Sequence, residues 1–264
     1  MSTKKTRTPD PPAEGDGWVG VDIGGTGIKA GLVDISKGTL IGSRIRVPTP
    51  HPSRPDAVVA ATAGLVSELT SSHPMGIGFP APFVARKVMM AANIDDAWIG
   101  VEASTRFAEA IGRPCTVLND ADAAGLAEMR FGAGKGVHGV VLLLTLGTGI
   151  GSALFHDGVL VPNTELGHIE VRGKAGEHRA AASVREVKGL SWKHWAERLN
   201  EYLAAVDRLI WPDLIILGGG VSKKPEKWLP HVEARPPVVP AQHQNEAGVV
   251  GAALFAHETF LARG

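Results

Sequence analysis

The chain contains two similar glycine-rich turns, and each lies between two apolar segments. The first copy covers residues 22–27 (Asp-Ile-Gly-Gly-Thr-Gly) and the second covers residues 145–151 (Thr-Leu-Gly-Thr-Gly-Ile-Gly). Glycine has no Cβ, so the backbone N–H groups of such turns can approach phosphate oxygens and form an anion nest. A unit repeated in this way predicts two similar lobes with a central cleft, in which phosphoryl transfer is the expected chemistry.

Charge and cysteine content narrow the function classes. The 264 residues include 27 basic and 27 acidic side chains and one cysteine. A formal charge of zero creates no general attraction for nucleic acid or for an anionic membrane, so neither is an expected partner. A single cysteine excludes an internal disulfide and a thiolate-rich zinc site. No apolar stretch reaches the ~18 residues that span a bilayer, and no signal-peptide core is present, so a cytoplasmic location is expected.

Three regions follow from the pattern along the chain. Residues 1–17 are polar and aperiodic, which predicts a disordered tail. Residues 18–118 alternate strand and helix patterns and are predicted to form a small lobe, residues 119–246 a large lobe, and a helix at 247–264 is expected to pack back on the small lobe. The expected strands are 18–23, 28–34, 39–47, 75–79, 84–90, 115–118, 140–146, 152–155 and 214–217, and the expected helices are 56–71, 104–111, 120–131, 191–211, one that begins at 221, and 247–261.

Several motifs together resemble the signature of the ROK family of sugar kinases and repressors. They are residues 22–29, the pair Asn119 and Asp120, residues 146–151, residues 165–168 (Glu-Leu-Gly-His) and residues 217–220 (Leu-Gly-Gly-Gly). The stretches 163–174, 192–195 and 220–224 are most similar to those of the polyphosphate glucokinases of that family. The resemblance runs from about Trp18 to the C-terminus. It implies an α/β, actin-like (ribonuclease H-like) fold, transfer of a terminal phosphoryl group to the 6-hydroxyl of glucose, and a homodimer.

One departure from the general ROK pattern concerns zinc. Most members follow the Gly-His motif with a cysteine-rich zinc loop, but residues 169–183 contain no cysteine. No zinc is therefore expected, and His168 is predicted to bind the sugar or to orient Glu165 instead. The polyphosphate glucokinases also lack this loop, so the departure supports the narrower resemblance.

Asp120 is the predicted catalytic residue. A carboxylate beside a sugar hydroxyl can accept its proton as the new O–P bond forms. The position of Asp120 in the first turn of a helix predicts that its charged form is favoured and its basicity lowered. Asp122 is interpreted as a capping or surface residue, and Asn163 as a turn residue.

The remaining site residues fall into three sets. Short amides, carboxylates and an imidazole are expected to bind the sugar hydroxyls: Asn93 (on the strength of the resemblance), Asn119, Asp120, Glu165 and His168; Glu177 is left open. The glycine turns and a nearby lysine are expected to bind phosphate: Gly24, Gly25, Thr26, Gly27, Lys29, Gly147, Thr148, Gly149, Gly219 and Gly220. Asp22 is expected to hold Mg²⁺, directly or through water.

The phosphoryl donor is open between polyphosphate and ATP, because both present a terminal phosphate to the same turns. A polymer needs a basic track leading from the cleft, for which the candidates are Lys135, Lys193, Lys223, Lys224, Lys227, Arg86 and Lys87. The alternatives are an ATP-dependent ROK hexokinase acting on glucose, mannose or an N-acetylhexosamine, and a sugar-binding regulator without catalysis. The regulator is disfavoured, because no helix-turn-helix fits in the residues before Trp18.

Overall fold

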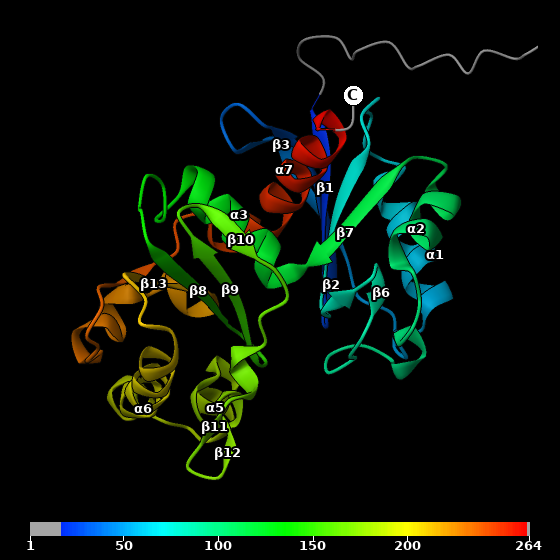
Figure 1. The fold of residues 1–264 in the computed structure, drawn as a ribbon. Helices are drawn as coiled ribbons and strands as arrows, with labels where there is room; N and C mark the ends of the chain where they lie inside the picture. Colours follow the sequence, from blue (N-terminus) through cyan, green and yellow to red (C-terminus); the bar gives the residue numbers. More distant parts are fainter. Residues whose placement is uncertain (1–16, 263–264) are drawn as a thin grey trace, which may run out of the picture.

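Each lobe is built on a five-stranded mixed sheet, and the two sheets repeat one topology (Figure 1). The computed structural model describes residues 17–262, so all but one residue of the predicted tail lies outside the described part. The first sheet has the order β3-β2-β1-β4-β7, with β1 Trp18–Gly24, β2 Gly27–Asp34, β3 Thr39–Val47, β4 Met75–Phe79 and β7 Cys115–Asn119. The second has the order β10-β9-β8-β13-β14, with β8 Val140–Leu146, β9 Ile150–His156, β10 Val159–Val161, β13 Leu214–Gly219 and β14 Val238–Pro240.

The repeat extends well beyond the glycine turns. In both sheets the first three strands are antiparallel neighbours, and the last two are added in parallel. Gly24 pairs with Gly27 in the first hairpin, and Leu146 pairs with Ile150 in the second, so the second turn is one residue longer. The α/β, actin-like fold with two lobes and duplicated phosphate turns is confirmed.

Helices cover the outer faces and fill the space between the sheets. The helices α1 (Pro55–Val66) and α2 (Ala103–Ile111) contribute Val58 and Phe107 to the core of the first lobe, while α6 (Trp192–Ile210) contributes Trp195 to the core of the second. The helix α3 (Asp120–Phe131) contacts β9, the C-terminal helix α7 (Ala247–Leu261) contacts β1 and β4, and α3 and α7 pack on each other. Figure 1 shows this pair between the two sheets. The short elements are α4 (Glu177–Ala180), α5 (Ala182–Val187), β11 (Glu170–Val171), β12 (Lys174–Ala175), η1 (Asp96–Trp98), η2 (Leu166–His168) and η6 (Gln244–Glu246).

Glycines permit backbone contact where α7 meets its neighbours. A Cβ added to Gly20 of β1 or to Gly76 of β4 would lie 1.9 Å or 1.8 Å from a backbone oxygen of α7. A Cβ added to Gly251 of α7 would lie 1.6 Å from the backbone oxygen of Ala123 in α3. The small-residue sequence of α7 therefore serves close packing between the lobes.

Three expected elements differ from the structure. The strand expected at 84–90 is instead two short strands, β5 (Phe83–Val84) and β6 (Lys87–Val88), joined by a turn in which Ala85 and Arg86 have φ of 49° and 70°. The helix expected from residue 221 is a series of 3-10 turns, η3 (Gly220–Lys223), η4 (Pro225–Lys227) and η5 (Leu229–His231). Pro225 and Pro230 lack the N–H groups that a continuous helix needs. The helix expected at 56–71 ends at Val66.

Candidate active site

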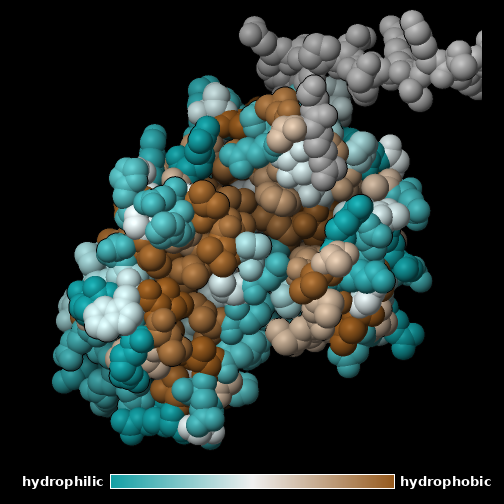
Figure 2. Space-filling view, in the orientation of Figure 1, coloured by the Kyte–Doolittle hydropathy of each residue, from teal (hydrophilic) through white to brown (hydrophobic). Residues whose placement is uncertain are grey.

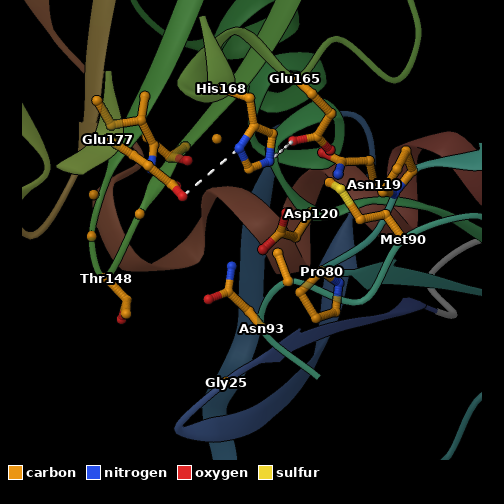
Figure 3. A pocket seen from close by; sticks show the side chains of 18 of the residues that line it. Gly25, Pro80, Met90, Asn93, Asn119, Asp120, Thr148, Glu165, His168 and Glu177 are labelled. Carbon is orange, nitrogen blue, oxygen red and sulfur yellow. Dashed lines mark hydrogen bonds and ion pairs between the residues drawn. The ribbon is translucent and has the colours of Figure 1, made fainter. Parts of the chain in front are cut away.

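A pocket of about 360 Å³ opens between the two glycine turns (Figure 3). It is lined from the first lobe by Gly25, Thr26, Pro80, Pro82, Met90, Ala92, Asn93 and Asn119, at the start of α3 by Asp120, and from the second lobe by Thr145, Gly147, Thr148, Gly149, Ile150, Gly151, Glu165, His168, Glu177 and Gly219. The structure thus brings all the predicted sugar-binding residues together with both phosphate turns. Asp22, Gly24, Gly27, Lys29 and Gly220 are not among the lining residues.

Asp120 enters the pocket where β7 turns into α3. Asn119 caps this helix, since its Oδ1 accepts hydrogen bonds from the N–H groups of Ala121 (2.8 Å) and Asp122 (3.1 Å). The Nδ2 amide of Asn119 is therefore the group left for a ligand. Asp120 Oδ1 also accepts a hydrogen bond from the N–H of Ala121 at 2.8 Å, which fixes the carboxylate at the helix end.

Burial raises the pKa of Asp120 to about 7, and the negative charge of Asp22 adds to this shift. The hydrogen bond from Ala121 lowers the pKa, and the charges of Glu165 and Asp122 raise it again. The expectation that the helix terminus would keep Asp120 charged and weakly basic was wrong, because desolvation and neighbouring carboxylates outweigh the helix end. A carboxylate with a pKa near neutrality is well matched to general-base catalysis.

The same shift predicts a pH dependence. The predicted role of Asp120 as general base requires its deprotonated form, so kcat/KM for glucose should fall below a pH of about 7, by roughly tenfold per pH unit. Initial rates at saturating donor, from pH 5.5 to 8.5, measure this limb. The limb should appear with polyphosphate and with ATP, because the titrating group belongs to the protein rather than to the donor. A profile that is flat down to pH 5.5 would contradict the assignment.

His168 lies between two carboxylates of the pocket. Its Nε2 is 3.7 Å from Glu165 Oε2, and its Nδ1 is 3.8 Å from Glu177 Oε1 (Figure 3). Burial raises the pKa of Glu165, while the nearby His168 lowers it and Glu177 raises it. Glu177 Oε2 also accepts a hydrogen bond from the N–H of Ile150 at 3.3 Å. Glu177, whose role the sequence left open, therefore links His168 to the second glycine turn.

The first phosphate turn carries a basic residue that sequence reasoning missed. Arg46 of β3 donates a hydrogen bond from Nη2 to the carbonyl oxygen of Thr26 at 3.2 Å, and its guanidinium lies over Gly27. Lys29, predicted to bind phosphate, places Nζ 2.7 Å from Asp22 Oδ2 in this structure. The sequence contained a signal for this residue. Arg44 and Arg46 occupy alternate positions of the strand that follows the first hairpin, a pattern that predicts both side chains on the same face.

Asp122 occupies a different environment from the one expected. It is 1% exposed rather than a surface residue, and its Oδ2 accepts a hydrogen bond from the N–H of Asn163 at 2.9 Å. Burial raises the pKa of Asp122 to about 7, against the effect of that hydrogen bond. The interpretation as a capping or surface residue was wrong, because α3 is covered on this side by the loop that contains Asn163.

The donor chemistry around the turns fits a magnesium ion. Among residues 17–262 there is no group of three or more His, Cys, Asp or Glu side chains that could hold a metal on its own. Mg²⁺ commonly uses one or two carboxylates and completes its shell with water and phosphate oxygens. Asp22, which is near enough to Asp120 to raise the pKa of that carboxyl, is such a carboxylate and precedes Gly24 of the first glycine turn by two residues.

The residues proposed for a polymer track lie outside this pocket. None of the basic candidates 86, 87, 135, 193, 223, 224 and 227 is among the residues that line it. Arg86 forms an ion pair with Glu102 at 2.7 Å. Lys223 shares a separate hollow of about 480 Å³ with Arg44, which is on the same strand as Arg46.

The fold and the pocket define a two-lobed sugar kinase, and residues 18–183 match the ROK family. The chain belongs to the ROK family. It is 50% identical over 250 residues to the polyphosphate glucokinase of Mycobacterium tuberculosis (strain CDC 1551 / Oshkosh), which covers 94% of each chain. The crystal structure of inorganic polyphosphate/ATP-glucomannokinase from Arthrobacter sp. strain KM superposes with a TM-score of 0.89 at 48% identity, covering 92% of this chain and 99% of the other. The ROK glucokinase of Streptomyces griseus, in complex with glucose and AMPPNP, gives a TM-score of 0.75 at 29% identity over 91% of this chain and 99% of its own.

No helix within residues 17–262 combines the length and the apolar character needed to cross a membrane.

Proposed function

We propose that this protein is a polyphosphate-dependent glucokinase, which transfers the terminal phosphoryl group of polyphosphate to the 6-hydroxyl of glucose. The observation that carries the proposal is the placement of Asp120, with a pKa of about 7, in a pocket between two phosphate-binding turns. The similarity to polyphosphate glucokinases over nearly the whole chain supports the choice of substrates. ATP is the alternative donor, and the relative from Arthrobacter is named for both donors.

In the proposed mechanism, the sugar hydroxyls are held by polar side chains that line the pocket from both lobes: Asn93, Asn119, Glu165, His168 and Glu177. Asp120 accepts the proton of the 6-hydroxyl as that oxygen forms its bond to the terminal phosphorus. The bond between this phosphorus and the bridging oxygen breaks, and the shortened chain leaves with the electron pair. Because Asp120 is already of intermediate basicity, proton removal and bond formation can proceed together.

The phosphate groups are proposed to lie between the turns of residues 24–27 and 147–149. Their N–H groups would bind the terminal phosphate, and Gly219 also lines the pocket. Mg²⁺ bound by Asp22 and by donor oxygens would neutralise charge on the transferred group. Lys29 holds Asp22 in place by its ion pair, and Arg46 adds positive charge at the first turn.

The proposal includes a cytoplasmic homodimer without nucleic acid or membrane partners. Figure 2 shows apolar side chains gathered over the region where Figure 1 draws β8, β9 and β10. On the edge strand β10, Val159 is 69% exposed and Val161 is 44% exposed. An apolar patch on this side of the molecule supports a second copy of the chain as a partner.

The test measures glucose 6-phosphate formation by the purified protein with Mg²⁺. Polyphosphate and ATP are each added as the only donor to a buffer that otherwise contains no nucleotide. We expect product with polyphosphate alone. Product with ATP alone would make the protein an ATP-dependent hexokinase of the same family. A lack of product with both donors would overturn the proposal and favour another sugar or a binding role.

Reversing the charge of two lysines of the proposed polymer track is expected to weaken the use of polyphosphate more than the use of ATP. Replacing Lys223 and Lys224 by glutamate should raise KM for polyphosphate by roughly tenfold, more for longer chains, and leave KM for ATP within about threefold. The reason is that a polymer, unlike ATP, is long enough to extend beyond the turns, and the proposed track includes the hollow that Lys223 shares with Arg44. Lys37→Glu is the control, because Lys37 lies at the far end of the first hairpin and pairs with Asp34. Equal losses for both donors would remove these lysines from the track.

A further inference from the structure

Asn163 connects three parts of the molecule through hydrogen bonds. Its side chain bonds both backbone groups of Phe83 in the first lobe: Oδ1 accepts from the Phe83 N–H at 2.8 Å, and Nδ2 donates to the Phe83 carbonyl oxygen at 2.9 Å. Its own N–H donates to Asp122 of α3. A side chain that pairs with both groups of one residue copies the pairing of a sheet, so Asn163 joins the lobes as a strand would.

The loop around Asn163 does not need Phe83 to hold its own shape. Ser152 of β9 fixes it within the second lobe, because Ser152 Oγ donates to the Thr164 carbonyl oxygen at 2.7 Å and accepts from the Leu166 N–H at 3.0 Å. Thr164 Oγ1 also donates to the Ser152 carbonyl oxygen at 3.0 Å. The bonds from Asn163 to Phe83 are therefore additional, and what they join is one lobe to the other.

These bonds lie between two walls of the sugar pocket. Phe83 directly follows Pro82, and Pro80 and Pro82 line the pocket from the first lobe. Asn163 precedes Glu165 by two residues, and Glu165 lines the pocket from the second lobe. The hydrogen bonds between Asn163 and Phe83 therefore set the distance between Pro80 and Pro82 on one wall of the pocket and the Glu165 carboxylate on the other.

Asn163 adopts a conformation that suits this use. Its φ is 62°, in the left-handed region that asparagine tolerates better than most residues. The hydrogen bonds that the Asn163 side chain makes to Phe83 in the other lobe offset the cost of this backbone conformation.

We propose that Asn163 is a positioning residue for glucose, which fixes the width of the sugar pocket by tying the Pro80–Phe83 wall to the loop of Glu165. This inference rests on the proposed function. It assigns to Asn163 an effect on sugar affinity rather than on donor affinity, since the phosphate turns are held by other contacts. The second turn, for example, receives hydrogen bonds from Ser183, whose N–H donates to the Gly147 carbonyl oxygen and whose Oγ donates to the Thr148 carbonyl oxygen.

The test replaces Asn163 by glycine, which keeps the left-handed backbone and removes both bonds to Phe83. We expect KM for glucose to rise by about tenfold or more, with KM for polyphosphate within about twofold of the unmodified protein. The dissociation constant of glucose, measured by calorimetry without donor, should rise by a similar factor. Asp157→Gly is the matched control, because Asp157 also has a positive φ (49°) and also accepts a backbone hydrogen bond, from Gly139, but is not among the pocket residues.

A second variant keeps the test decisive if the glycine variant does not fold. Asn163→Asp retains an acceptor for the Phe83 N–H but sets a carboxylate oxygen against the Phe83 carbonyl oxygen where the amide donated, so glucose KM is again expected to rise by about tenfold or more. Glucose KM and dissociation constant within about twofold of the unmodified protein in both variants would overturn the proposal. So would a fall in kcat with both KM values unchanged, which indicates only a smaller folded fraction. If the unmodified protein phosphorylates no glucose, the proposed function fails, and calorimetry alone decides the role of Asn163.

Discussion

Asp120→Asn is expected to lower kcat by about 10³-fold while the dissociation constant of glucose stays within about threefold. Asparagine has nearly the same shape as aspartate and can still accept the hydrogen bond from the N–H of Ala121. It cannot take up the proton of the 6-hydroxyl. Single-turnover rates at saturating glucose and donor measure the chemical step, and calorimetry measures glucose binding.

The pH profile of the variant provides an independent check. The residual activity of Asp120→Asn should lack the acidic limb near pH 7, because the group that titrates there is gone. Asp34→Asn is the control, since Asp34 lies at the opposite end of the first hairpin from the glycine turn. Turnover within about tenfold of the unmodified protein would show that another group accepts the proton.

Gly251→Ala is expected to destabilise the folded state by about 3 kcal/mol or more. The new Cβ would lie 1.6 Å from the backbone oxygen of Ala123, and backbone atoms on both sides leave no side chain that could move away. The helices α3 and α7 would have to separate, and they are the elements that pack between the two sheets. Urea unfolding followed by tryptophan fluorescence measures the change in the free energy of unfolding.

Gly64→Ala is the matched control for this substitution. Gly64 lies on the exposed side of α1, and no atom lies within 4 Å of the Cβ position. The same change there should stabilise the protein by about 0.5–1 kcal/mol, because alanine loses less conformational entropy than glycine in a helix. If both variants unfold at the same urea concentration, the helices α3 and α7 are not in backbone contact.

Local sequence patterns were sufficient where one element's own residues decide its structure. The strands of both hairpins were predicted because apolar segments flank glycine-rich turns, and the helix was predicted at the residues where it occurs, 120–131. The errors occurred where a few residues change direction. The turn at Ala85 and Arg86 divides what looks like one strand, and two prolines divide what looks like one helix.

The candidate site was predicted in composition but not in its electrostatics. Motif residues from both halves of the chain were expected around one cleft, and the structure places Asn93, Asp120, Glu165 and His168 on one pocket. The basicity of Asp120 was predicted with the wrong sign. The position of Asp120 at the start of a helix can be read from nearby residues. Its burial and its proximity to Asp22, which lies on a different element, depend on how the chain folds.

The sequence by itself determined the duplicated hairpins, the two lobes and the residue types available for phosphoryl transfer, because these depend on glycine spacing and on apolar patterns that are short in range. Only the tertiary structure decided which charges face each other. Asp120 lies near the charges of Asp22 and Glu165, and Asn163 reaches Phe83, 80 residues earlier in the chain. The physical reason is that pKa values and bonds between lobes depend on burial and on distances between side chains, which are fixed only when α3 and α7 bring the two sheets together.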